Sequence, residues 1–220
     1  SAASEVYKRQ VVADALSNAD PSGPPAIDWK ATLAYRRHLL DLGFGIAEAM
    51  DTSQRGMGLD WPSALELISR SLEDAGPRAG MIYSGCGTDQ LPAADAKSLD
   101  DVVKAYLEQL PAIQKLGGRI ILMASRALVK VAKSPDDYVK VYSRVLAEAD
   151  HPVVLHWLGE MFDPALKGYW GADDFKPAME TCLAAIAANV AKVDGIKISL
   201  LDDGKEITLR RRLPPAVKMY

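Results

Sequence analysis

The sequence predicts an α/β protein built as a (β/α)8 TIM barrel, and three observations lead to that prediction. Short apolar segments alternate with amphipathic segments of helical length, at roughly 33–42 residues per repeat, which is the order of a parallel sheet. The strand segments are short and contain Gly, Ala, Ser and Glu rather than long Val/Ile runs. Polar residues also stand where five of these segments end. A barrel brings all such ends to one mouth, whereas an open sheet brings together only two or three.

The composition is that of an ordinary globular protein. Of 220 residues, 49% are apolar and 25% are charged, and the formal net charge is −3. This charge balance provides no excess of positive charge that would bind nucleic acid or an anionic membrane. No apolar run approaches the ~20 residues of a membrane span. No signal-peptide pattern is found. The two cysteines, Cys86 and Cys182, form neither a disulfide framework nor a metal-ligand spacing, so we expect a reduced, cytoplasmic protein.

The elements can be assigned in order. A first strand is expected over residues 8–15, around Val11 and Val12, and a helix follows over residues 29–42, between an Asp28 N-cap and Gly43. Further strands are expected over residues 45–50, 80–84, 119–124 and 151–158, around Lys197, and from near Val217 onward. Further helices are expected over residues 63–72, 98–116 and 175–190, and from Ser134-Pro135.

The expected barrel is incomplete at its C-terminus. Such barrels typically need about 250 residues, and about seven strands can be counted here, the last unfinished. We therefore treat residues 1–220 as a single, partial TIM-barrel domain, and expect it to be a piece of a longer natural chain.

One predicted strand carries a lysine in its middle. Because a strand has period two, Gly195, Lys197 and Ser199 share one face, while Ile196 and Ile198 share the other. An ammonium group is costly to bury unless it is paired or neutralised, and desolvation is one way in which catalytic amines are made.

Lys197 has two interpretations at this point. As a nucleophile it must be neutral, and with a reference pKa near 10.4 only about one amine in 10³ is neutral at pH 7. Burial or a nearby cation such as Arg126 or Arg55 would have to depress its pKa. Alternatively, Lys197 forms a buried structural ion pair with Glu48 or Asp202.

His156 is the second candidate for chemistry. It shares a strand face with Val154, so a regular strand points both side chains into the barrel. An inward histidine beside a lysine suits proton transfer near neutral pH, although a hydrogen-bonded core histidine fits the same pattern. His38 and His151 are expected to be structural.

Two motifs carry a family resemblance. The segment HPVVLHWLG, followed about 40 residues later by VDGIKIS, resembles strands five and six of the dihydrodipicolinate synthase/N-acetylneuraminate lyase superfamily, whose GIK strand supplies a Schiff-base lysine. The similarity extends over roughly residues 45–220. The segments AEAMDTSQRGMGLDW and GCGTDQL more closely resemble an uncharacterised group of dihydrodipicolinate synthase-like proteins, classed as a domain of unknown function. The resemblance implies that Lys197 occupies the Schiff-base position.

The sequence departs from the superfamily pattern at three places. The tyrosine of the PxxLY strand is replaced by His156, and the Thr-Thr pair with the Gly-Glu that follows it reads Asp51-Thr52-Ser53-Gln54. The Pro-Tyr-Tyr segment reads Ser125-Arg126-Ala127-Leu128. The tyrosine relay of the superfamily is therefore not intact, and pyruvate is not carried over as the substrate.

We accordingly predict a class I aldolase-type carbon–carbon lyase or synthase, acting on a keto acid or sugar-derived carbonyl compound through a Lys197 Schiff base, with His156 moving the proton. No cofactor and no nucleic-acid or membrane partner is expected, and the protein is expected to form a homo-oligomer, a dimer or tetramer. The residues expected to bind the substrate are Glu48, Asp51, Thr52, Thr88, Asp89, Ser125, Arg126, Glu160 and Ser199.

Two alternatives stay open. Glu48, Asp51, His156 and Glu160 combine carboxylates with an imidazole and would suit Zn, Mn or Mg in a metal-dependent isomerase, epimerase or hydrolase, although no HxH or HExxH spacing supports them. The other alternative is a non-catalytic binding protein.

Overall fold

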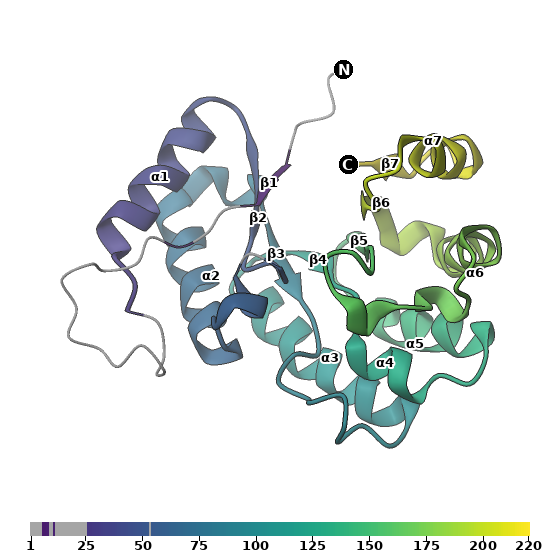
Figure 1. Ribbon diagram of the computed structural model, residues 1–220. Helices are drawn as coiled ribbons and strands as arrows, with labels where there is room; N and C mark the ends of the chain where they lie inside the picture. Colours follow the sequence, from purple (N-terminus) through teal and green to yellow (C-terminus); the bar gives the residue numbers. More distant parts are fainter. Residues whose placement is uncertain (1–5, 9–10, 12–25, 53) are drawn as a thin grey trace. The chain divides into compact units, whose positions relative to one another are not determined.

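The computed structural model describes residues 6–8, 11, 26–52 and 54–220, and seven strands lie within them (Figure 1). The chain divides into two compact units, which we describe separately. The first contains residues 1–85 and 112–120, and the second contains residues 86–111 and 121–220.

The first unit is a short parallel β/α array. Strands β1 (Val6–Lys8), β2 (Gly45–Glu48) and β3 (Ile82–Cys86) pair in parallel in chain order. Helix α1 (Trp29–Asp41) connects the first two strands and helix α2 (Trp61–Ala75) connects the next two. All four residues of β2 are buried, as expected of a strand covered on both faces.

Local sequence explains where these two helices begin and end. The Asp28 carboxylate accepts a hydrogen bond from the first turn of α1, and Gly43, at a φ of +84°, follows its end. Asp60 caps α2 in the same way, with Pro62 in the first turn. Both predicted helices are confirmed, and α2 is longer than expected.

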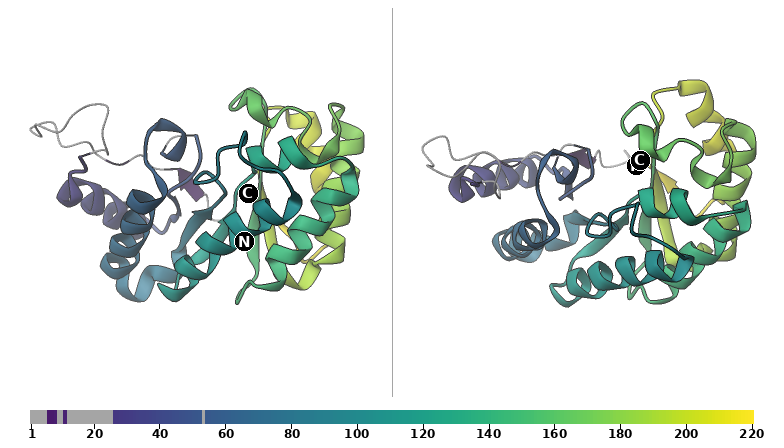
Figure 2. Two further views of the ribbon diagram at one scale, coloured as in Figure 1. Left: turned by 90° about the horizontal axis from the view of Figure 1, so that it is seen from below. Right: turned by 60° about the horizontal axis from the view of Figure 1, so that its bottom comes forward.

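The second unit holds the other strands in the same arrangement. Strands β4 to β7 pair in parallel in chain order, and Figures 1 and 2 show α5, α6 and α7 following one another along one side of them. Two elements, α3 (Leu99–Lys115) and β4 (Arg119–Leu122), are divided between the two units. The second unit alone contains α4 (Arg126–Val131), α5 (Pro135–Ala147), β5 (Val153–Leu158), α6 (Phe175–Ala188), β6 (Val193–Ser199), α7 (Asp203–Arg212) and β7 (Lys218–Met219).

An aromatic cluster joins β5 to the helices beside it. Trp157 of β5 stacks on Phe175 of α6, with ring centroids 5.7 Å apart and an interplanar angle of 23°. Trp170, which is fully buried, lies 4.7 Å from the Tyr142 ring of α5 and 6.1 Å from that of Trp157. The Trp157 side of β5 is therefore the helix-covered side.

The structure corrects some predicted elements. The first strand is Val6–Lys8 rather than 8–15, and residues 9–10 and 12–15 lie outside the described part of the chain. Two helices, α4 and α7, were not predicted, because α4 has only six residues and α7 buries a single residue, Leu209. Strand β3 starts later than expected because residues 76–81 form a 3₁₀ turn.

Parallel strands that pair in chain order and are connected through helices give the order of a (β/α)8 barrel. In the described residues this order reaches the seventh strand, β7, at the place near Val217 where a last strand was expected. None of the described helices combines the length and apolar character needed to cross a membrane.

Candidate active site

The paired strands β5 and β6 place His156 directly opposite Lys197, and Leu158 directly opposite Ser199. Residues paired in this way point to the same face of a sheet. Since Trp157 faces α6, the side chains of His156, Lys197 and Ser199 point to the opposite face.

The Ser199 hydroxyl connects the lysine to the histidine. The Lys197 Nζ donates a hydrogen bond of 2.9 Å to the Ser199 Oγ, and the His156 Nε2 lies 3.2 Å from the same Oγ. A hydroxyl that accepts from Lys197 is able to donate its own proton to Nε2 in the tautomer that leaves this nitrogen unprotonated. The imidazole is fully buried, whereas Lys197 and Ser199 are half-buried. The result is a continuous hydrogen-bonded path from a partly accessible amine to a buried ring.

Two glycines allow close contacts of the backbone around the trio formed by His156, Lys197 and Ser199. A Cβ atom at Gly195 would lie 2.6 Å from the Cε2 of Tyr220, and a Cβ atom at Gly159 would lie 3.0 Å from the carbonyl oxygen of Ser199. The Gly159 N–H donates to that same oxygen at 2.9 Å. The end of β5 is thereby fixed against the end of β6.

A pair of hydroxyl groups follows β3 and β4 in the second unit. The Thr88 Oγ1 and Ser125 Oγ are 2.6 Å apart, and both residues are almost completely buried. Ser125 also accepts a hydrogen bond from the Leu128 N–H, which caps α4. The Met123 N–H donates to the Cys86 carbonyl at 2.8 Å and holds the two segments together.

Buried tyrosines support this hydroxyl pair. The Tyr169 hydroxyl accepts from the Ser125 N–H at 3.2 Å and lies 2.9 Å from the Tyr142 hydroxyl, while the Tyr106 hydroxyl donates to the Met123 carbonyl at 2.6 Å. Burial raises the pKa of Tyr169 to about 12 and the pKa values of Tyr106 and Tyr142 well above their usual range. All three phenols are neutral at physiological pH and act as hydrogen-bonding supports.

The loop that follows β3 is anchored to α3. Gln109 is fully buried, and its amide donates to the Asp89 carboxylate at 3.1 Å and to the Gln90 side-chain oxygen at 2.5 Å. Its own oxygen accepts from the Gly87 N–H at 2.8 Å. Sequence reasoning missed Gln109, although an amide on an otherwise apolar helix face was a usable indication.

In the first unit, Glu48 at the end of β2 is fully buried in a polar cluster. Its carboxylate accepts two hydrogen bonds from the Arg36 guanidinium, through Nε and, at 2.6 Å, through Nη2. It also accepts from the Ser71 hydroxyl at 2.7 Å and from the Gln54 amide at 3.3 Å. Arg36 is therefore the counter-ion of Glu48. Asp202, the other acid considered for Lys197, caps α7 and pairs with Lys205 at 3.3 Å.

Asp51 and Thr52 follow Glu48 in the same unit. The Asp51 carboxylate accepts from the Thr52 N–H at 2.8 Å, and the Asp51 carbonyl accepts from the Gly56 N–H. Arg55 donates to the Gly85 carbonyl at 2.6 Å and lies over the Trp61 ring, 5.1 Å from its centroid. These contacts fix the course of the loop between β2 and α2.

The remaining predicted site residues lie in the second unit. Arg126 pairs with Asp163 at 2.6 Å, and Glu160 is exposed just beyond the end of β5. The structure thus brings together Lys197, His156 and Ser199 as one group and Thr88 with Ser125 as another.

The four residues of the metal alternative fall in different units. Glu48 and Asp51 belong to the first unit, and His156 and Glu160 belong to the second. Within the described ranges, no group of three or more His, Cys, Asp or Glu side chains is arranged to hold a metal ion.

Residues 4–220 match a protein family described as "Protein of unknown function (DUF993)". The chain belongs to this family. No curated protein matches the chain. The predicted membership of an uncharacterised family is confirmed.

Solved structures support the fold of this family member. Dihydrodipicolinate synthase from Oceanobacillus iheyensis is 16% identical, with a TM-score of 0.61, and the match covers 97% of this chain and 59% of that one. The 4-hydroxy-tetrahydrodipicolinate synthase from Methylacidiphilum fumariolicum SolV is 16% identical, with a TM-score of 0.66 and coverages of 97% and 60%. The 2-keto 3-deoxygluconate aldolase from Picrophilus torridus is 14% identical, with a TM-score of 0.68 and coverages of 97% and 64%.

The chain therefore spans about 60% of the length of these structures. At such low identity the likeness shows the fold alone. That fold is the TIM barrel, present here in part, as predicted from the sequence.

Proposed function

We propose that this family member provides the lysine-bearing part of a class I aldolase-type carbon–carbon lyase or synthase, which acts on a keto acid or a sugar-derived carbonyl compound. The observation that carries the proposal is the path Lys197–Ser199–His156, with separations of 2.9 and 3.2 Å. The fold shared with solved synthases and an aldolase supports the same reaction class by analogy.

The proposed chemistry follows from the groups present. The Lys197 lone pair attacks the substrate carbonyl carbon, the nitrogen loses a proton and the carbonyl oxygen takes one up, which gives a carbinolamine. Protonation of its hydroxyl and loss of water leave an iminium ion. When a hydroxyl of the departing fragment loses its proton, that fragment leaves as a carbonyl compound and the iminium ion accepts the electron pair of the broken carbon–carbon bond as an enamine, which is then protonated and hydrolysed to free the lysine. His156 supplies and removes these protons through the Ser199 hydroxyl, because an imidazole acts both as an acid and as a base.

We propose binding roles for the other polar residues near the strand ends. Thr88 and Ser125 present paired hydroxyl groups, which suit a hydroxyl or carboxylate oxygen of the substrate. Asp89 and Arg126, which lie in the same unit, are assigned to the same task. Glu48 has its carboxylate occupied by Arg36, Ser71 and Gln54, so its proposed role is to position the loop that carries Asp51 and Thr52. Self-association into a dimer or tetramer stays a prediction.

Borohydride trapping tests the proposal. The protein is incubated with a panel of 2-keto acids and aldehydes, reduced with borohydride, digested and examined by mass spectrometry. We expect one substrate-sized mass addition on the peptide that contains Lys197, and none in Lys197→Arg. The exposed Lys140→Arg serves as the matched control and should keep the adduct. The absence of an adduct across the panel, or its appearance on another lysine, would contradict the proposal.

The relay has a separate test. Ser199→Ala removes the hydroxyl between the amine and the ring without changing either group. We expect the adduct to form still, but about 10²-fold more slowly, which is the usual contribution of a positioned proton-transfer group. His156→Asn should slow the reaction at least as much and flatten its pH profile between pH 5 and 8. An unchanged rate in both variants would show that the path does not carry protons.

A further inference from the structure

A pocket of about 280 Å³ opens on the second unit behind the candidate site. It is bordered by the end of β5, the loop that follows β5, the start of α6 and the loop between β6 and α7. Trp157 lines it, and Trp157 faces away from His156 on the same strand. The pocket therefore reaches the helix-covered side of β5, and none of Lys197, His156 and Ser199 lines it.

Part of the pocket lining is apolar. Trp157 stacks on Phe175, and only 5% of the Trp157 surface is exposed. Met161 and Leu200 also line the pocket, and Met161 is 62% exposed, as expected of a side chain at a rim. Stacked aromatic rings beside flexible aliphatic side chains suit a small apolar group of the ligand, either flat or branched.

Three charged side chains line the same pocket: Glu160, Asp173 and Lys205. Of these three, only Lys205 forms an ion pair within the described residues. The Lys205 ammonium pairs with Asp202 at 3.3 Å and lies 5.9 Å from the centre of the Phe175 ring. For Glu160 and Asp173, the described part of the chain provides no hydrogen bond or ion pair. Two carboxylates in a pocket that is also lined by aromatic rings favour a ligand that carries a positive charge.

The pocket touches the candidate site through the backbone. Gly159 and Leu200 line the pocket, the Gly159 N–H donates to the Ser199 carbonyl at 2.9 Å, and Leu200 follows Ser199 directly. A ligand in the pocket would thus contact the peptide segments that hold Ser199 in place, without reaching the Lys197 amine.

We propose that this pocket is a second ligand site, which binds an amphipathic monocation: an apolar or aromatic body that ends in an ammonium group. The body packs on Trp157 and Phe175, and the ammonium group is held by Glu160 and Asp173. The ligand is a separate small molecule rather than the far end of the carbonyl substrate, because none of Lys197, His156 and Ser199 lines the pocket. This inference does not depend on Schiff-base chemistry.

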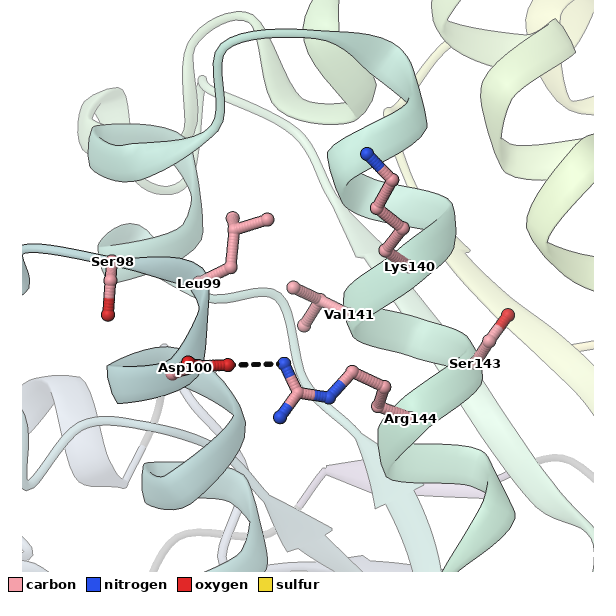
Figure 3. Close-up of a pocket in the computed structure, with 7 residues that line it drawn as sticks. All are labelled: Ser98, Leu99, Asp100, Lys140, Val141, Ser143 and Arg144. Atoms are coloured by element: carbon pink, nitrogen blue, oxygen red, sulfur yellow. Dashed lines mark hydrogen bonds and ion pairs between the residues drawn. The ribbon is translucent and has the colours of Figure 1, made fainter.

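Another hollow, of about 470 Å³, serves as the comparison. It lies between the start of α3 and α5, and Figure 3 shows Leu99 and Val141 on its walls. Its acidic group, Asp100, is already paired with Arg144 at 2.5 Å. This hollow therefore has no carboxylate left for a cation, and Asp100→Asn is a matched control.

Calorimetric titration with three probes of similar size tests the proposal: phenethylammonium, 2-phenylethanol and 3-phenylpropionate. We expect the cation to bind at least about 10-fold more tightly than the alcohol, with the anion weakest, and the preference to shrink with added salt. The double variant Glu160→Gln/Asp173→Asn should bind the cation no better than the alcohol. Because both side chains are exposed, the fold should be unaffected, which circular dichroism checks. Asp100→Asn should behave like the unmodified protein.

Several results would overturn the inference. These are no binding of the cation up to millimolar concentration, equal affinity for all three probes, or a cation preference that survives in the double variant. Lys197→Ala should bind phenethylammonium unchanged. If the probe instead blocks borohydride trapping at Lys197 competitively, the pocket belongs to the substrate and the separate-ligand proposal fails. If trapping itself fails while cation binding persists, only the proposed lyase activity is lost.

Discussion

At the scale of single residues, the buried Arg36–Glu48 pair is the most consequential contact of the first unit. Both side chains are almost fully shielded from water, and Ser71 and Gln54 satisfy further acceptor positions of the carboxylate. Removing one partner of such a pair leaves an uncompensated buried charge, which typically costs about 3–5 kcal/mol. Urea denaturation should show a loss of this size in Glu48→Gln.

The exposed pair Arg70–Glu66 is the control for this prediction. Its two side chains are about half exposed, and such surface pairs contribute about 0.5 kcal/mol or less. Glu66→Gln should therefore leave the urea midpoint nearly unchanged. Equal, small effects in both variants would mean that Glu48 does not bear the assigned structural role.

Gly195 gives a second residue-scale prediction. A Cβ atom there would meet the Tyr220 ring at 2.6 Å and the Lys218 carbonyl at 2.9 Å, so Gly195→Ala must push β6 and β7 apart. We expect a loss of about 1–3 kcal/mol in the free energy of unfolding, the usual cost of overpacking. Gly80→Ala, where no atom lies within 4 Å of the added carbon, should be nearly neutral by the same thermal melt. A neutral Gly195→Ala would refute the close approach.

At the scale of elements, the start of α5 depends on one carboxylate. Asp137 accepts hydrogen bonds from the Lys133 and Ser134 N–H groups at 2.9 and 3.2 Å, and chiefly the Lys133 bond holds its pKa below the usual value. A pKa lowered by folding contributes stability above the unfolded pKa of about 3.9, and this stability is lost as the pH falls through the folded pKa. Asp137→Ala should thus cost about 1 kcal/mol at pH 7 and much less near pH 3.

Asp136→Ala is the control for this helix start, because Asp136 lies in the same first turn, is exposed and has the same charge. Asp136→Ala should lower the free energy of unfolding only slightly, and by a similar amount at every pH. The urea denaturation midpoints of both variants, measured from pH 3 to 7, test this difference in pH dependence. A deficit in Asp137→Ala that is constant over this range would argue against the carboxylate as the cause.

Elements with clear sequence signals could be predicted, and elements without an apolar stripe could not. Helix α1 carried both end markers, Asp28 and Gly43, and was found from them. Helix α7 reads DGKEITLRRR and buries only Leu209, so no apolar stripe marked it. Its start is fixed by the Asp202 carboxylate, which accepts a hydrogen bond from the Lys205 N–H. The same limit applied to the site. Period two placed Lys197 and Ser199 on one face, but the register that sets His156 against Lys197 is a tertiary property.

At the scale of the whole molecule, the kind of element that supplies each side chain explains which site residues could be identified from the sequence. The β5–β6 trio lies within one unit and was named from strand alternation and the GIK motif. The Arg36–Glu48 and Gln109–Asp89 contacts depend on helices that pack beside their strands. Polar residues on helix faces have no periodicity of their own, so Arg36 and Gln109 were not identified.

The whole molecule should also unfold at alkaline pH because of its buried phenols. Of eight tyrosines, four have pKa values raised chiefly by burial: Tyr106, Tyr138, Tyr142 and Tyr169. For an acid whose folded pKa is raised, stability is complete below the unfolded pKa, here about 10, and is lost as the pH rises above it.

Four such groups lower the free energy of unfolding by about 5 kcal/mol for each pH unit above 10, which would exhaust an ordinary stability of about 5–15 kcal/mol within a few units. We expect absorbance at 295 nm to show part of the tyrosines ionising near pH 10 while the circular dichroism signal is intact. The remainder should ionise together with a cooperative loss of that signal at about pH 11–12. If all eight tyrosines ionised near pH 10 in a folded protein, the buried hydroxyl network around Tyr169 and Ser125 would be disproved, and with it the support assigned to the Thr88–Ser125 pair.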